Sequence, residues 1–325
     1  MTILLSTFLP LTQNYFMGKI AIAIHGGAGT ILQSEMTVEK ELSYKNALKE
    51  ALDAGYIILA NGGTALDAVE QAVIVLENCP LFNAARGSVF NANGAHEMDA
   101  SIMDGRNRDA GAVSGIDGIK NPVSLARKVM EKTEHVLLMG EGAMEFAKTI
   151  GFSILEKDYF FDEFRYQQWL SIRDSDSFQL DHSVKREQKF GTVGAVATDA
   201  EGNVAAATST GGMTNKKFGR VGDSPIIGAG TYASNHTCAV SCTGSGEFFI
   251  KSVVAYDVSC LMEYKGLSLS EACLEAVQER LKTLGGDGGL VAVDHQGNIC
   301  MEFNTPGMYR ACRDSNGREE VLIYS

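Results

Sequence analysis

Hydrophobic residues follow two spacings along this chain, and together they predict a layered α/β fold. The continuous apolar run Ile20–Ile24 is typical of a buried strand, and apolar residues at helical spacing predict a helix over Val38–Ala60. A glycine pair ends this helix, and Thr64 is placed to cap a second helix that continues to about Leu76. Similar patterns predict further strands over Gly111–Ser114, Ile226–Tyr232, Cys238–Cys242, Gly289–Val293 and Ile299–Phe303. They also predict helices over Val123–Lys132 and Gly142–Ile150, and two more between Phe248 and Leu284.

A β-hairpin is predicted in the second half of the chain. Residues Thr192–Thr198 and Val204–Thr210 read as strands, and Asp199–Asn203 between them reads as a turn. A hairpin centred on residue 201 would set Thr192 opposite Thr210, where two threonine side chains can form a hydrogen bond. We therefore expect Thr210 to orient the Thr192 hydroxyl, unless a bulge or a one-residue register shift turns it to the other face.

The segment before this hairpin looks like a place where the chain is cut. Residues 173–190 are charged and polar, which predicts a flexible linker, and they end abruptly at Gly191 and Thr192. A threonine that begins a chain carries a hydroxyl nucleophile and an α-amine with a pKa of roughly 7.7 to 8.0, which can accept a proton at working pH. The alternative is that Gly191 and Thr192 only start a strand after a loop.

Two glycine-rich segments follow the hairpin. The first, residues 211–225, carries Arg220 and Asp223, which could hold the carboxylate and the ammonium group of a small zwitterionic ligand. The alternative is a surface ion pair of little energetic value. The second, Ser241–Glu247, is a run of small residues at a strand-to-helix turn, where backbone N–H groups can hold an oxyanion.

Five ordered motifs give the chain a resemblance to a known family. They are IHGGAGT (24–30), FNAARGSVFNANGAHEMDASIMDG (82–105), GTVGAVATDAEGNVAAATSTGGMTNK (191–216), GRVGDSPIIGAGTYA (219–233) and SCTGSGE (241–247). From about residue 18 to its end, the chain resembles the plant-type asparaginase and isoaspartyl peptidase family of N-terminal nucleophile hydrolases. The resemblance implies a four-layer αββα sandwich. It also implies hydrolysis of β-aspartyl dipeptides and of L-asparagine, two small-molecule substrates.

The resemblance assigns roles to particular residues. It implies self-cleavage between Gly191 and Thr192, which gives an α subunit (17–191) and a β subunit (192–325) of one intertwined domain, paired further as a dimer of αβ units. Thr192 becomes the nucleophile, with Thr210 beside it. Arg220 and Asp223 would grip the substrate, and the oxyanion would be stabilised by Thr243 and Gly244. Other expected pocket residues are Asn83, Val221, Gly222, Ser245 and Gly246.

The resemblance also implies a structural sodium ion held by backbone carbonyls, and no organic cofactor or catalytic metal. The expected ligands are the carbonyls of Leu76, Glu77, Cys79, Phe82, Ala84 and Arg86. Hard cations with oxygen ligands suit such a loop. The chain departs from the pattern of bacterial members at Ala85-Arg86-Gly87, where Gly-Ile-Gly is more usual, and at Asp287, where a small residue is more familiar. The first change bears on the sodium loop and its packing, and neither change touches the proposed nucleophile or the substrate clamp.

Composition narrows the remaining possibilities. The 325 residues are 45% hydrophobic with a mean hydropathy of −0.02, which fits an ordinary globular enzyme, of one large sandwich or two domains. A formal net charge of −12 disfavours nucleic acid and anionic membrane as partners. Seven cysteines without a CxxC pair suggest neither a disulfide framework nor a zinc site, and favour reduced thiols in the cytoplasm.

Two questions stay open at this point. Residues 1–16 read as an upstream extension or a mis-assigned start; residues 3–9 are apolar but too short to span a bilayer, and a short export signal is the less favoured alternative. The competing functions are glycosylasparaginase and a non-catalytic homologue that binds amino acids through Arg220 and Asp223.

Overall fold

The computed structural model describes residues 18–174 and 191–325, and within them a mixed α/β structure is built around two β-sheets. The larger sheet has the strand order β12-β11-β1-β5-β6-β2-β3-β4. Its strands are β1 (Ala21–Gly29), β2 (Met98–Asp104), β3 (Ala110–Ile116), β4 (Leu137–Met139), β5 (Val193–Thr198), β6 (Val204–Thr210), β11 (Gly307–Asp314) and β12 (Glu319–Tyr324). The pair β3 and β4 is parallel, and the other neighbours in this sheet are antiparallel.

The smaller sheet packs against one face of the larger one. Its order is β10-β9-β8-β7, and its strands are β7 (Thr231–Ala233), β8 (Cys238–Gly244), β9 (Gly288–Asp294) and β10 (Ile299–Phe303). β8 and β9 contact β1, β5 and β6 of the larger sheet. Because these central strands meet another sheet on one face and helices on the other, they are buried along their whole length, as the burial of every residue of β1 illustrates.

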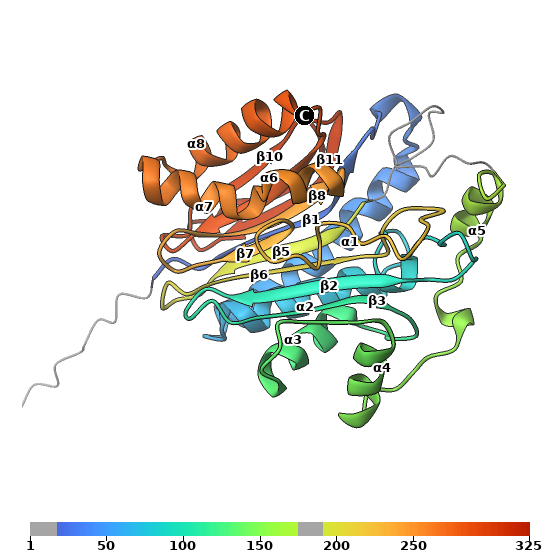
Figure 1. Ribbon diagram of the computed structural model, residues 1–325. Helices are drawn as coiled ribbons and strands as arrows, with labels where there is room; N and C mark the ends of the chain where they lie inside the picture. The colour runs from blue at the N-terminus through green and yellow to red at the C-terminus, as the bar shows by residue number, and fades with distance from the viewer. Residues whose placement is uncertain (1–17, 175–190) are drawn as a thin grey trace, which may run out of the picture.

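Helices cover the outer faces of both sheets (Figure 1). α1 (Val38–Ala60), α2 (Ala65–Asn78) and α3 (Pro122–Lys132) pack on the larger sheet, and α4 (Gly140–Thr149) lies beside β3. α7 (Val254–Lys265) and α8 (Leu269–Leu274) pack on the smaller sheet, and α8 continues into a π-helical segment over Glu275–Leu281. The short helices α5 (Glu163–Leu170) and α6 (Gly246–Ser252) complete the set in the described residues, together with 3₁₀ turns over Gln33–Glu35, Ala85–Gly87 and Lys157–Tyr159.

Several predicted elements are confirmed, and two are wrong. The predicted strand Ile226–Tyr232 is only the three-residue β7, because Gly228 has a φ of +91° and Ile226 N–H donates to the Asp223 carbonyl in a turn. Between Phe248 and Leu284 the chain forms α6, α7 and α8 in place of two helices, because Val253 adopts a left-handed φ of +49° and interrupts the first. The sequence pattern did not predict β2, β4, β11, β12 or α5.

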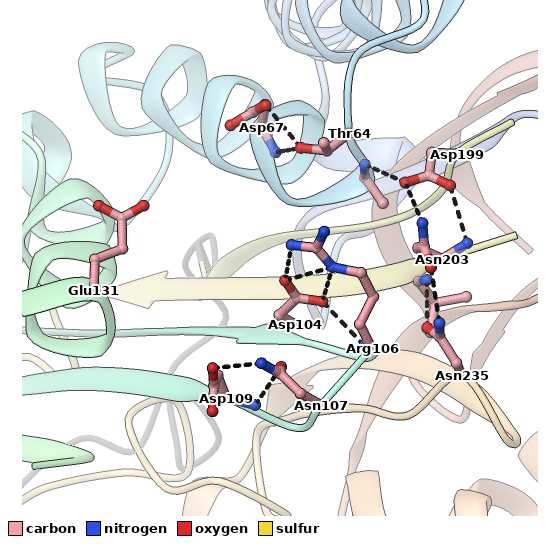
Figure 2. A network of polar contacts seen from close by, with 12 residues as sticks. Thr64, Asp67, Asp104, Arg106, Asn107, Asp109, Glu131, Asp199, Asn203 and Asn235 are labelled. Carbon is pink, nitrogen blue, oxygen red and sulfur yellow. Dashed lines mark hydrogen bonds and ion pairs between the residues drawn. The ribbon is translucent and has the colours of Figure 1, made fainter. Parts of the chain in front are cut away.

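The predicted hairpin forms with the predicted register. Val193 pairs with Ser209 and Thr198 pairs with Val204, so that Thr192, one residue before β5, faces Thr210. The far end of the hairpin is tied to the start of α2 by Asp199 (Figure 2). Its carboxylate accepts hydrogen bonds from the N–H groups of Glu201 and Asn203 within the turn, each at 3.0 Å, and from Ala65 N–H at 3.2 Å. This anchor fixes the register on which the Thr192 position depends.

Two predicted segments lie wholly or mostly outside the described residues. The predicted extension, residues 1–16, lies outside the described residues, as does the predicted linker 173–190 apart from its first two positions. In the described parts of the chain, no helix combines the length and the apolar character that crossing a bilayer requires.

Candidate active site

The hairpin brings two threonine hydroxyls together at the end of the larger sheet. Thr192 Oγ1 donates a hydrogen bond to Thr210 Oγ1 at 3.2 Å, and Thr210 Oγ1 also accepts one from Gly212 N–H at 3.0 Å. Ser224 Oγ also lies 3.5 Å from Thr192 Oγ1. All three hydroxyl residues are buried, with Thr192 8% exposed. The nucleophile candidate therefore contacts two hydroxyls, of which the sequence predicted only Thr210.

The bond between Gly191 and Thr192 lies against the end of β1. A Cβ on Gly27 would come 2.5 Å from Gly191 N, so this approach requires glycine at position 27, whose φ of +113° also favours it. A Cβ on Gly191 would lie 3.0 Å from Thr243 Oγ1, which accepts a hydrogen bond from Ala28 N–H at 3.3 Å. Thr243, one of the two expected oxyanion residues, thus borders the proposed cleavage site.

A cavity opens beside Thr192, and most of the predicted pocket residues line it. Its lining includes Asn83, Gly191, Thr192, Thr210, Arg220, Gly222, Asp223 and Gly244, together with Ser224, Met213 and Thr214, which were not predicted. Of the predicted residues that are not in this lining, Gly246 packs against the clamp, where a Cβ would lie 2.9 Å from both Arg220 and Asp223. Ser245 is held away by Asp287, whose carboxylate accepts its hydroxyl hydrogen. Val221 and Thr243 also lie outside the lining.

The cation of the predicted clamp is paired with a carboxylate that the sequence did not single out. Arg220 donates through Nε and Nη2 to the two oxygens of Glu247, at 2.8 and 2.9 Å. This bidentate pair engages Nε and Nη2 of the guanidinium, while Nη1 is the nitrogen nearest to Gly222 of the cavity lining. The predicted alternative, a surface pair between Arg220 and Asp223, does not form.

Asp223 is the most perturbed group of the cavity. It is buried, and among the described residues its Oδ2 atom has no hydrogen-bond partner. Burial raises the pKa of this carboxyl to about 7, although the nearby charge of Arg220 acts to lower it. A buried carboxylate oxygen without a donor is an acceptor for which an ammonium group would supply the missing partner.

Asn83 fixes the glycine-rich loop that borders the cavity. Its side-chain amide donates to the Gly212 carbonyl at 2.7 Å, and its side-chain oxygen accepts from Val89 N–H at 3.1 Å. Its own backbone carbonyl accepts from Gly211 N–H at 3.1 Å. Two of these bonds hold Gly211 and Gly212 and the third holds Val89, so Asn83 contributes to the shape of the cavity wall.

The predicted sodium loop has crowded carbonyls and one side chain that is engaged elsewhere. A Cβ on Gly87 would collide with the backbone oxygens of Pro80 and Phe82, so carbonyls gather at this turn, as cation binding requires. Glu77 instead directs its buried carboxylate to Val123 N–H, at 3.0 Å, which leaves only its carbonyl for a cation. The Arg86 guanidinium packs over the Tyr159 ring at 5.6 Å. No cluster of His, Cys, Asp or Glu in residues 18–174 and 191–325 could hold a metal by its side chains.

Comparison with known proteins shows the family to which this chain belongs. Residues 18–323 match the family described as asparaginase, and the chain belongs to this family of hydrolases, as its motifs predicted. Among its relatives, the isoaspartyl peptidase of Escherichia coli is 53% identical over 91% of this chain and 93% of its own length. The isoaspartyl peptidase/L-asparaginase of Xenopus laevis is 46% identical, covering 89% of this chain and 91% of the relative. The plant-type L-asparaginase of Pyrococcus abyssi is also 46% identical, over 89% and 94%.

Proposed function

We propose that this chain is an autoprocessing threonine hydrolase that removes N-terminal isoaspartyl residues from dipeptides and hydrolyses L-asparagine to aspartate and ammonia. The observation that carries the proposal is the pair of threonine hydroxyls, Thr192 and Thr210, 3.2 Å apart beside a cavity lined by Arg220 and Asp223. The names of the relatives, isoaspartyl peptidase and L-asparaginase, support the same two substrates. The fold we assign is the four-layer αββα sandwich of N-terminal nucleophile hydrolases.

In the first proposed reaction, the chain cuts itself before Thr192. The Thr192 hydroxyl attacks the carbonyl carbon of Gly191, and the peptide C–N bond breaks while a C–O ester bond forms. The hydroxyl proton passes to the nitrogen of Thr192, which becomes a free amine. Water then hydrolyses the ester, releasing the Gly191 carboxylate and restoring the Thr192 hydroxyl. Glycine before the cut leaves the approach to this carbonyl unobstructed, because it has no Cβ.

In the second proposed reaction, the freed residue acts on substrate. The Thr192 amine takes the proton of its own hydroxyl, which attacks the side-chain carbonyl of an asparagine or isoaspartyl group. Thr243 and Gly244 stabilise the oxyanion. The proton passes to the leaving nitrogen, which departs as ammonia or an amino acid, and water then releases aspartate from the ester. Asp223 receives the substrate ammonium and Arg220 its carboxylate, through the guanidinium edge that Glu247 does not occupy.

Three further assignments belong to this proposal. The loop from Leu76 to Arg86 binds sodium through the backbone carbonyls of Leu76, Glu77, Cys79, Phe82, Ala84 and Arg86, and the ion would brace the wall that contains Asn83 without taking part in catalysis. The α and β subunits stay together and pair as a dimer of αβ units. The enzyme works in the cytoplasm, which is supported by seven cysteines that are all unpaired thiols.

The experiment is intact mass spectrometry of the purified protein, combined with hydrolysis assays. We expect two polypeptides divided between Gly191 and Thr192, and a single uncut chain without activity for Thr192→Ala. The assays compare a β-aspartyl dipeptide, L-asparagine and a glycosylated asparagine. Preference for the glycosylated substrate would assign the chain as a glycosylasparaginase. An uncut wild-type protein that binds amino acids without turnover would refute hydrolysis altogether.

A further inference from the structure

A row of polar side chains crosses the larger sheet directly behind the Thr192 position. In strand register, His25 of β1 pairs with Gly194 of β5, Gly194 pairs with Thr208 of β6, and Thr208 pairs with Ser101 of β2. Paired residues of neighbouring strands share a face, and Gly194 is two residues beyond Thr192, so the row lies one step inward from the nucleophile. Buried polar groups at this depth need partners, because an unpaired one destabilises the folded state.

The partners come from the smaller sheet. Ser241 of β8 and Thr231 of β7 are paired in register, and both are fully buried against the row. Ser241 Oγ lies 2.8 Å from His25 Nε2 and 2.7 Å from Thr208 Oγ1. Thr231 Oγ1 lies 2.5 Å from Thr208 Oγ1 and 2.7 Å from Ser101 Oγ. The side chains thus form one continuous chain of hydrogen bonds between the two sheets.

Glycine at position 194 makes this chain of hydrogen bonds possible. A Cβ there would collide with Ser241 Oγ and would lie 2.5 Å from His25 Nε2. Glycine is therefore required in the middle of β5, because the two sheets approach closely there and a side chain would separate His25 from Ser241.

The contact between His25 and the Thr192 carbonyl determines the direction of the hydrogen bonds that follow, from His25 as far as Thr231. His25 Nδ1 lies 3.0 Å from the backbone carbonyl of Thr192, which can only accept, so Nδ1 carries the hydrogen. Burial lowers the pKa of His25 to about 3, so the imidazole is neutral and Nε2 must accept from Ser241. Since a hydroxyl has one hydrogen, Thr208 then donates to Ser241, and Thr231 donates to Thr208.

The far end of the chain reaches the loop that carries the clamp. Ser101 Oγ lies 2.7 Å from Thr231 Oγ1 and 2.6 Å from the backbone carbonyl of Ser224, the residue after Asp223. Ser101 has a single hydrogen for these two contacts, so the one-way part of the network runs from Thr231 to the Thr192 carbonyl, and Ser101 lies between Thr231 and the Ser224 carbonyl, beside the clamp carboxylate.

We propose that this one-way chain of hydrogen bonds positions Thr192 for catalysis by holding its carbonyl, and with it the hydroxyl and the α-amine, in fixed register with the Asp223 loop. The proposal rests on the proposed function, because it concerns the placement of a nucleophile in that reaction. His25, Ser241, Thr208, Thr231 and Ser101 are positioning residues, since none of them lines the cavity. A misplacement of about 1 Å can cost a rate factor of roughly a hundred.

The test removes the Thr208 hydroxyl from the middle of this hydrogen-bond network and keeps the volume of the side chain nearly constant. Thr208→Val removes the hydroxyl that donates to Ser241 and that accepts from Thr231, and Thr208→Ser restores it. Thr198→Val is the matched control, because Thr198 is also fully buried, lies on β5, and donates its hydroxyl to the Asp294 carbonyl at 2.6 Å, away from this row. We expect Thr208→Val to lower kcat roughly ten- to a hundredfold with KM unchanged, and Thr208→Ser and Thr198→Val to keep kcat close to wild type.

A second readout reports on the hydrogen-bond direction itself. In a long-range ¹H–¹⁵N correlation spectrum, we expect wild-type His25 to be the neutral Nδ1–H tautomer throughout the range of about pH 5 to 8 in which an ordinary histidine titrates. If Thr208→Val does not fold, Ser241→Ala removes the neighbouring hydroxyl with a smaller side chain and should lower kcat by a similar factor.

Three outcomes would overturn the proposal. The first is a Thr208→Val or Ser241→Ala enzyme with wild-type kcat. The second is a loss that Thr198→Val matches or that Thr208→Ser does not rescue, which would indicate a purely structural role. The third is a charged or Nε2–H His25. Failure of the proposed function is separately visible, because the wild-type protein itself would then remain uncut and inactive.

Discussion

Replacing Asp223 by asparagine should make the protein more stable while it destroys substrate binding. Asp223 is only 3% exposed, and in the described residues its Oδ2 atom accepts no hydrogen bond. Burial raises the pKa of its carboxyl from 3.8 to about 7. The folded protein therefore favours the neutral acid, and ionising Asp223 without a bound ammonium group lowers the free energy of unfolding.

The magnitude follows from the two pKa values. Each pH unit between them corresponds to about 1.4 kcal/mol, so the difference between 3.8 and about 7 amounts to roughly 4 kcal/mol. A raised pKa gives stability that is fully present below the unfolded value of 3.8 and is lost as pH rises through about 7. Asparagine has a similar shape and no charge, so its advantage over aspartate should grow by roughly 2 to 3 kcal/mol between about pH 5 and about pH 8.

The assay is urea unfolding of Thr192→Ala with and without Asp223→Asn, at both pH values. The Thr192→Ala background is expected to remain one uncut chain, which avoids subunit dissociation during unfolding. Because each comparison is made at a single pH, the titration of all other groups cancels. A stability difference that is constant, or that shrinks as pH rises, would refute the reasoning. In the cleaved enzyme, Asp223→Asn should lower kcat/KM at least about a hundredfold, because an ammonium group loses its charged partner.

The remaining predictions concern the two contacts that orient the site. Glu247→Gln weakens the bidentate hold on Arg220, and we expect KM to rise several-fold at unchanged kcat; steady-state kinetics would contradict this role if kcat alone fell. Thr210→Val removes the acceptor of the Thr192 hydroxyl and should lower kcat by roughly a hundredfold while KM stays the same, with Thr210→Ser as the control that retains the hydroxyl. Equal kcat values for the valine and serine variants would show that the Thr210 hydroxyl is dispensable.

The parts of the fold that could be predicted are those determined by local sequence. Thr192 and Thr210 lie at the open end of one hairpin, whose short turn is closed by Asp199, so their pairing follows from their spacing in the sequence. β2 was not predicted because its sequence, MDASIMD, looks too polar for a buried strand, yet all seven residues are buried. One oxygen of its Asp99 accepts hydrogen bonds from Ser114 and Gly115 of the neighbouring strand, and the other lies 4.0 Å from Lys216 Nζ.

The same distinction applies to the candidate site, where residues close together in the sequence were predicted and their distant partners were not. Arg220 and Asp223 lie in one loop and were predicted together, whereas the partner of Arg220 is Glu247, 27 residues further along the chain. Ser224 contacts Thr192 although 32 positions separate the two residues in the sequence. The contact of His25 with Thr192 joins residues 167 positions apart, which no local pattern could indicate.

The strand order predicts that the two products of cleavage cannot separate while the fold is intact. If the chain is cut before Thr192, β1, β2, β3 and β4 belong to the first fragment, and β5, β6, β11 and β12 belong to the second. In the larger sheet β1 lies between β11 and β5, and β6 is paired with β2, so the fragments share three strand pairs. Separation would expose these edges and the core between the sheets. We expect two bands on a denaturing gel from a single peak in native gel filtration, and fragments that separate without denaturant would contradict this arrangement.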